Sequence, residues 1–211
     1  MIELEGLERD ALIELVNIGV SRAAVGLRKM VGEQVTLSVP SLDLMTRAAA
    51  TKLIRERENM DLVAVSQDFE GVFSGRALLI FPLDSGQSLV RVVASDVIGD
   101  GEIDLIEEET LAETGNIVLN QCIGSMANML QQRLTLSLPQ IIRGNGQSLF
   151  EQSATADDGV VLFLYINFAI DVRDVRGYIA MLMDLPSLAV LKRLVNDFIT
   201  RIVGPEVSGA A

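Results

Sequence analysis

Two residue types that can hold a reacting molecule in place, glutamate and asparagine, occur together twice in this chain of 211 residues. In each copy an acidic residue is followed by a glutamate, an asparagine and a proline at the same spacing. The two copies lie ninety-nine residues apart and consist of Asp10, Glu14, Asn17 and Pro40, and of Glu109, Glu113, Asn116 and Pro139. The residues before each proline also match, as TLSVP and TLSLP. This pattern indicates an internal repeat with two candidate sites.

The chemistry open to these sites is narrow. The chain contains no histidine and a single cysteine, Cys122. Ser-His-Asp triads, Cys-His pairs and His/Cys zinc sites are therefore excluded. Cys122 falls toward the apolar side of its predicted helix, which favours a buried, inert thiol over a nucleophile. Carboxylates, amides, hydroxyls and basic side chains remain.

A helix would place each set on one face, because positions separated by three and four residues stand above one another. For the first set, residues 4–31 have apolar side chains near the helical period, at Leu4, Leu7, Ala11, Leu15, Ile18 and Val25. We expect the polar sets to face solvent. A single Glu-x-x-Asn pair is typical of an ordinary solvated helix face. Asparagine costs roughly half a kcal/mol relative to alanine inside a helix, so its recurrence at mid-helix favours a function.

The remaining elements follow from periodicity and turn residues. Helices are predicted at 4–31, 46–58, 85–98, 107–132 and 187–203, and strands at 35–39, 62–66, 75–82, 134–138, 160–169 and 175–185. Pro40 and Pro139 are predicted to end their strands, and residues 143–146 to form a loop.

Each half thus reads helix–strand–helix–strand–strand–helix, with the second helix shrunken in the second half. This order predicts an α+β fold in which both halves share one antiparallel or mixed sheet. The two long helices would occupy pseudo-twofold positions and expose the candidate sites. We predict one domain over residues 1–204, built from repeats at about 1–99 and 102–204 that join at Gly99–Gly101, and a flexible tail at 205–211.

Composition limits the partners. With 49% hydrophobic and 22% charged residues the chain resembles an ordinary globular protein. Its formal net charge of -12 disfavours nucleic acid and anionic membranes. The acidic N-terminal residues lack a signal-peptide pattern, so we expect a cytoplasmic protein.

The string Asp-x3-Glu-x2-Asn-x22-Pro resembles the signature of the CheC/CheX/FliY family of chemotaxis phosphatases, and two copies in one chain resemble its CheC type most. The resemblance implies hydrolysis of the aspartyl phosphate on a CheY-type response regulator. Glu14 and Glu113 would pair with the lysine of this receiver, and Asn17 and Asn116 would hold a water in line with the phosphorus. Asp10 and Glu109 would assist docking, although the family pattern has Asp or Ser where the second copy has Glu109.

The chemistry of the side chains agrees with these implied roles. Phosphoryl transfer depends on positioning and charge stabilisation rather than on a strong base. An amide can accept a hydrogen bond from water and donate one to a phosphoryl oxygen. The chain would need no cofactor of its own, because the magnesium would belong to the receiver.

Two alternatives stay open. The chain could be a non-catalytic adaptor that binds a response regulator or the deamidase CheD, because the resemblance to CheC proteins also implies CheD as a partner. It could also be a duplicate in which only one site is active.

Overall fold

The computed structural model describes residues 3–58, 61–94, 103–151, 159–170 and 173–204. In chain order its elements are α1 (Gly6–Val31), β1 (Val35–Thr46), α2 (Arg47–Arg57), β2 (Leu62–Gly71), β3 (Gly75–Pro82), α3 (Leu83–Ala94), α4 (Ile103–Met129), β4 (Leu134–Leu136), β5 (Gln140–Gly144), α5 (Gly146–Glu151), β6 (Val160–Ile170), β7 (Arg173–Met183) and α6 (Leu185–Val203). The predicted linker at 99–101 and the predicted tail at 205–211 lie outside the described residues.

The strands form one seven-stranded sheet in the order β1-β6-β7-β3-β2-β4, and β5 also pairs with β2. Every pairing in the sheet is antiparallel. The central β3–β7 pairing joins a strand of the first half to a strand of the second. The prediction of an α+β fold with one shared sheet is therefore confirmed, and its strands are antiparallel rather than mixed.

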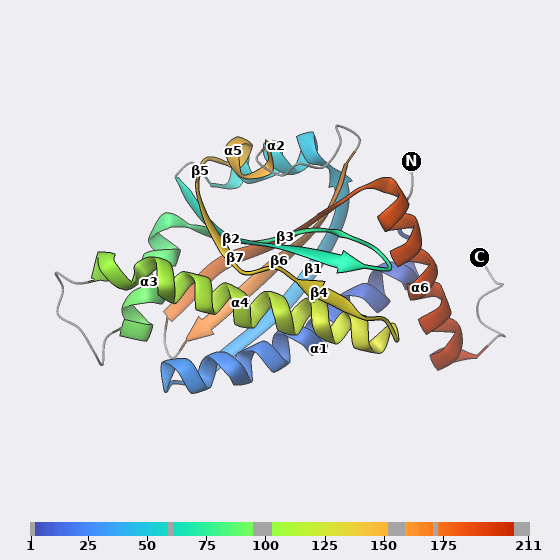
Figure 1. Cartoon of the computed structure of the whole chain (residues 1–211), viewed down its shortest axis with the longest axis horizontal. Coiled ribbons are helices and arrows are strands. Elements are labelled where there is room, and N and C mark those ends of the chain that lie inside the picture. The colour runs from blue at the N-terminus through green and yellow to red at the C-terminus, as the bar shows by residue number, and fades with distance from the viewer. Residues whose placement is uncertain (1–2, 59–60, 95–102, 152–158, 171–172, 205–211) are drawn as a thin grey trace.

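Helices cover both faces of the sheet (Figure 1). The long helices α1 and α4 lie side by side on one face, and they share a large core with residues of α3 and α6. The short helices α2 and α5 cover the other face over a smaller core. Strand β2 shows why two cores form: Val63 and Val65 enter the large core, while Leu62 and Ala64 enter the small one. Alternate side chains of a strand point to opposite faces.

The two halves pair their edge strands in comparable registers. Val35 of β1 lies opposite Ile170 of β6, and Leu134 of β4 lies opposite Gly71 of β2. Leu134 lies ninety-nine residues after Val35, and Ile170 lies ninety-nine residues after Gly71. This agreement is what a repeat would produce, but the common origin of the halves stays a prediction.

The buried face of α1 differs from the predicted stripe. Leu15 is buried as expected, but Leu7 and Val25 are 54% and 60% exposed. The residues that face the core are Leu12, Leu15, Val16, Gly19, Val20, Ala23, Leu27 and Val31. The stripe prediction was wrong because the apolar residues of α1 cover more than one face, and packing against α4 decides which face is buried.

Helices α1 and α4 approach closely at Gly19. A Cβ atom at this position would lie 2.6 Å from the Cα atom of Cys122, so only glycine fits. Near the same crossing, Arg22 Nη1 donates to Ser125 Oγ over 3.0 Å. Cys122 is 4% exposed, and burial raises the pKa of its thiol to about 12. The prediction of a buried thiol is confirmed, and the raised pKa is what an unreactive thiol would have.

The edge strands correct the prediction at the prolines. Strand β1 does not end before Pro40 but continues to Thr46, with a register shift between Ser38 and Ser41. A bulge of this kind lets an edge strand pass a proline, which cannot donate to the ladder. The strand at Pro139 does stop, since β4 ends at Leu136, but the predicted 143–146 loop is partly wrong because β5 includes Arg143 and Gly144.

None of the helices in the described segments combines the length and apolar character that crossing a bilayer requires.

Glu8 fastens the start of α1 to α6. Its carboxylate accepts hydrogen bonds from Glu5 N over 2.8 Å and from Asn196 Nδ2 over 2.7 Å, and it lies 3.1 Å from Lys192 Nζ. The residue is 3% exposed. Burial alone would raise the pKa of Glu8, but these hydrogen bonds and the lysine charge together lower it.

We therefore predict that Glu8→Ala lowers the free energy of unfolding by about 2 kcal/mol at pH 7, because it removes the acceptor of Asn196 Nδ2 and the carboxylate that pairs with Lys192. A carboxylate whose pKa is lowered by folding stabilises the protein above its unfolded pKa and loses that effect as the pH falls through its folded pKa. The difference between Glu8→Ala and the unmodified protein should consequently shrink below about pH 4.5. Urea unfolding from pH 3 to pH 8 measures this, with exposed Glu33→Ala as the control. A pH-independent difference would contradict the electrostatic explanation.

Candidate functional site

The four predicted carboxylate residues lie on exposed helix surfaces, as the sequence predicts. We call Asp10, Glu14 and Asn17 the first ridge and Glu109, Glu113 and Asn116 the second ridge. All four carboxylate residues are exposed, on the neighbouring helices α1 and α4 (Figure 1). The expectation of solvent-facing ridges is confirmed for these residues. Both asparagines are half-buried, because each turns part of its side chain toward the sheet or its own helix.

Asn17 is bonded through both atoms of its carboxamide to the backbone of one residue in β1. Its Oδ1 accepts from Val39 N over 3.0 Å, and its Nδ2 donates to Val39 O over 3.4 Å. Val39 immediately precedes Pro40 and lies within the bulge, where the register of β1 against β6 shifts. The asparagine side chain thus satisfies the backbone groups that the interrupted ladder leaves without a strand partner.

This contact gives the spacing in the first copy a structural meaning. Twenty-two residues separate Asn17 from Val39, and the next residue is the proline that requires the bulge. The helix therefore supplies an amide at the point where the edge strand lacks a donor and an acceptor. The sequence predicted a strand terminator at Pro40, but it did not predict this hydrogen-bonded partner beside the proline.

Asn116 on α4 is held differently. Its Oδ1 accepts from Gln67 Nε2 over 3.2 Å and from Asn120 Nδ2 over 2.5 Å. Asn120 also donates to the backbone oxygen of Asn116 over 2.7 Å. Within the described residues the Nδ2 group of Asn116 has no hydrogen-bond partner. The two asparagines therefore offer different atoms to a ligand: Asn116 presents its NH2 group, whereas both amide atoms of Asn17 are bonded.

Gln67 connects Asn116 to the strand break at Pro139. Its Nε2 donates a second hydrogen bond, over 2.8 Å, to the backbone oxygen of Ser137. Ser137 N in turn donates to Asp68 O over 2.9 Å, and its Oγ accepts from Asp68 N. Sequence reasoning missed Gln67, which lies forty-nine residues before Asn116. No clear signal in the sequence points to it, because Gln67 follows the predicted strand at 62–66 and stands between two other polar residues.

The break exposes a large apolar side chain beside the second ridge. Leu138 is 85% exposed, whereas Val39, at the matching place in β1, is 2% exposed. The first ridge has its own apolar neighbours, since Leu7 and Val25 stand on the same side of α1 as Glu14. Carboxylates, amides and isolated apolar side chains together make a surface suited to another protein rather than an enclosed pocket for a small molecule.

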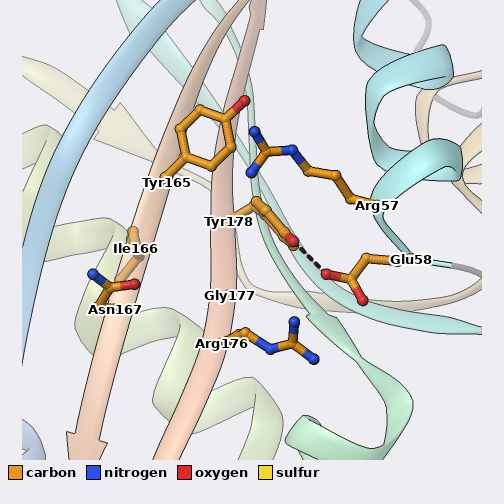
Figure 2. A pocket seen from close by; sticks show the side chains of 8 residues that line it. All are labelled: Arg57, Glu58, Tyr165, Ile166, Asn167, Arg176, Gly177 and Tyr178. Atoms are coloured by element: carbon orange, nitrogen blue, oxygen red, sulfur yellow. Dashed lines mark hydrogen bonds between the residues drawn. The ribbon is translucent and has the colours of Figure 1, made fainter.

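A separate cavity of about 230 Å³ opens on the opposite face of the sheet, near the end of α2 (Figure 2). Figure 2 shows the Tyr178 hydroxyl directed at the Glu58 carboxylate, to which it donates a hydrogen bond. Burial raises the pKa of Tyr178, and the hydrogen bond to the Glu58 carboxylate raises it further. The guanidinium of Arg57 lies 4.3 Å from the centre of the Tyr165 ring. Several of the polar groups here are partnered with one another, and no predicted site residue lines the cavity.

Among the described residues, no cluster of three or more His, Cys, Asp or Glu side chains could hold a metal ion.

Comparison with known proteins gives sequence relatives although no family model matches the chain. The flagellar motor switch phosphatase FliY of Bacillus subtilis is 24% identical over 145 residues, which cover 66% of this chain and 36% of the relative. The CheY-P phosphatase CheC of the same organism is 19% identical over 196 residues, which cover 87% of this chain and 91% of the relative. The chain thus spans about a third of the length of FliY and nearly all of CheC.

Solved structures share the fold. Thermotoga maritima FliY superimposes with a TM-score of 0.71 at 18% identity, covering 95% of this chain and 99% of that one. The middle domain of FliM from H. pylori superimposes with a TM-score of 0.57 at 10% identity, covering 90% and 99%. At these identities the structures establish the fold alone.

The bond between Asn17 and Val39 predicts a structural cost for removing the amide. We expect Asn17→Ala to lower the free energy of unfolding by about 1 to 2 kcal/mol, because the buried N–H of Val39 loses its acceptor. Urea denaturation measures the change. Ser21→Ala, an exposed position one turn further along α1, is the matched control and should leave stability nearly unaltered. Equal stability of the Asn17 variant and the control would show that the amide does not support β1 in solution.

Proposed function

We propose that this chain is a member of the CheC/CheX/FliY family and hydrolyses the aspartyl phosphate of a phosphorylated CheY-type response regulator. The observation that carries this proposal is the pairing, on two adjacent helices, of an exposed glutamate with an asparagine whose amide is held by the protein itself. Such a surface can enter the active site of a partner and add a positioned amide to it. The partner would supply the phosphoryl group and the magnesium, and the chain would need no cofactor of its own.

Asn17 and Asn116 would orient the attacking water. An amide cannot act as a base at neutral pH, but it can bond a water molecule and a phosphoryl oxygen at the same time. That is sufficient for phosphoryl transfer, in which fixing the water in line with the phosphorus lowers the entropic part of the barrier. Asn17 would exchange its bonds to Val39 for bonds to the receiver, while the NH2 group of Asn116 is already without a partner among the described residues.

Glu14 and Glu113 would form ion pairs with the lysine of the receiver. Both are exposed, and each lies one helical turn before its asparagine, so a lysine bound there would bring the phosphoryl group toward the amide. Asp10 and Glu109, a further turn away, would assist docking. A chain of net charge -12 gains no long-range attraction for an acidic receiver. Recognition would therefore depend on local contacts, including the exposed Leu7, Val25 and Leu138.

The alternative is an adaptor that binds a response regulator or the deamidase CheD without accelerating hydrolysis. The fold is shared with the FliM middle domain, and a shared fold does not by itself imply phosphatase chemistry. The adaptor therefore stays an alternative to the phosphatase.

The first test of the proposal removes the two amides. We expect Asn17→Ala and Asn116→Ala each to retain part of the turnover of phosphorylated receiver, and the double variant to lose about a hundredfold or more, because no amide then holds the water. Loss of phosphate from purified, ³²P-labelled receiver measures the rate. Ser21→Ala is the control for a neutral change on the same helix.

Three outcomes separate the hypotheses. An unaltered rate in the double variant would rule out the catalytic assignment of both asparagines. Receiver binding by the unmodified protein without faster hydrolysis would favour the adaptor. Loss of all turnover in one single variant would show that only one copy is active.

A second test concerns the glutamates. In the Asn17→Ala background, which leaves the second ridge intact, we expect Glu113→Gln to raise the KM for the receiver about three- to tenfold, because a pair with the receiver lysine is lost. The effect should diminish as ionic strength rises. Glu33→Gln in the same background removes an equal charge far from the ridge and should leave KM nearly unchanged. An equal effect of both variants would indicate net charge rather than a specific pair.

A further inference from the structure

We propose that Gln67 of β2 is a positioning residue for the second ridge: it holds the Asn116 carboxamide with its oxygen toward the sheet and its NH2 group available to the receiver. This inference rests on the proposed function and deepens it, because it assigns a part in the reaction to a residue that cannot touch the partner. Gln67 is 1% exposed.

The orientation of the Gln67 amide follows from its neighbours. Its Nε2 is 3.2 Å from Asn116 Oδ1 and 2.8 Å from Ser137 O, both of which are acceptors. Rotating the amide by half a turn would bring Oε1 against these two oxygens and lose both bonds. Gln67 Oε1 is buried and has no hydrogen-bond partner in the described part of the chain. A buried acceptor without a partner is unfavourable, so the structure retains this side chain at a cost in stability.

The bonds to Asn116 fix which of its atoms faces outward. A carboxamide oxygen has two lone pairs, and here Gln67 and Asn120 each donate to it. Asn120 lies on the same helix as Asn116, one turn further on, and so does not connect the amide to the sheet. Gln67 belongs to the sheet and ties the amide to a fixed frame. Without Gln67 only Asn120 would still bond the oxygen, and the amide would lose its hydrogen bond to the sheet.

The corresponding position at the first ridge carries no such group. Matching positions in the paired edge strands of the two halves are ninety-nine residues apart in the sequence. Gln67 on β2 therefore corresponds to Ile166 on β6. Ile166 is buried in the large core and cannot donate a hydrogen bond. Asn17 is instead bonded to the backbone of Val39. An effect of Gln67 on catalysis should therefore be confined to the second ridge.

This confinement provides the test. Gln67→Met keeps the length and approximate volume of the side chain but removes the donor. In the Asn17→Ala background, where only the second ridge acts, we expect kcat for receiver dephosphorylation to fall about tenfold, with KM within about twofold because Gln67 is out of the partner's reach. In the Asn116→Ala background, where only the first ridge acts, both parameters should stay within about twofold. Ile166→Met, which places the same residue at the corresponding buried position, should leave kcat within about twofold in either background.

A purely structural role would give another result. Damage to the fold would lower kcat in both backgrounds and reduce the midpoint of urea unfolding, whereas we expect the midpoint to change little because the unpartnered Oε1 is removed together with the donor. An equal fall in both backgrounds, or no fall in either, overturns the proposal.

A measurement independent of activity separates this inference from the proposed function. The side-chain amide resonances of Asn116 in an NMR spectrum should shift in Gln67→Met, while those of Asn17 should not. If the unmodified protein fails to accelerate dephosphorylation, the proposed function falls, and a shift confined to Asn116 still establishes that Gln67 holds this amide. Unchanged Asn116 resonances overturn the inference whatever the activity.

Discussion

A proline in an edge strand leaves backbone groups that no neighbouring strand can satisfy, and the arrangement of the candidate sites depends on how this structure satisfies them. At Pro40 the amide of Asn17 bonds both polar groups of Val39. At Pro139 the strand opens, and Gln67 bonds Ser137 while also bonding Asn116. In both places a side-chain amide connects a long helix to an interrupted strand. Each asparagine is thereby hydrogen-bonded to a strand of the sheet.

The same contact links stability to the proposed chemistry. An amide that must orient water inside another protein needs a defined direction, and hydrogen bonds to a rigid sheet provide one. The two copies achieve this differently. The first binds its amide by both atoms, so that binding a receiver would require an exchange of hydrogen bonds. The second holds its amide by the oxygen alone. The proximity of exposed Leu138 to the second ridge adds a further difference, since the matching Val39 is buried.

Much of the fold could be predicted from local patterns. Helical and strand periodicity predicted the order of elements. The absence of histidine excluded several kinds of catalytic site and left carboxylates and amides, which are the side chains of the ridges, among the candidates. The errors have a common cause. Leu7 and Val25 satisfy the helical period yet are exposed, because the neighbour packed at Gly19 selects the buried face. Pro40 resembles a strand end, yet β1 continues, because a bulge and the amide of Asn17 compensate for the missing donor.

The sequence by itself determined which residues could form the ridges, since the spacing of acid, glutamate and asparagine is a property of one helix and does not depend on its neighbours. Only the tertiary structure decided what holds each asparagine. Asn17 reaches a strand twenty-two residues away and Asn116 reaches a glutamine forty-nine residues away, on different strands of the sheet. Hydrogen bonds between such distant residues depend on strand order and register, which arise from the packing of the whole sheet and leave no local pattern in the chain.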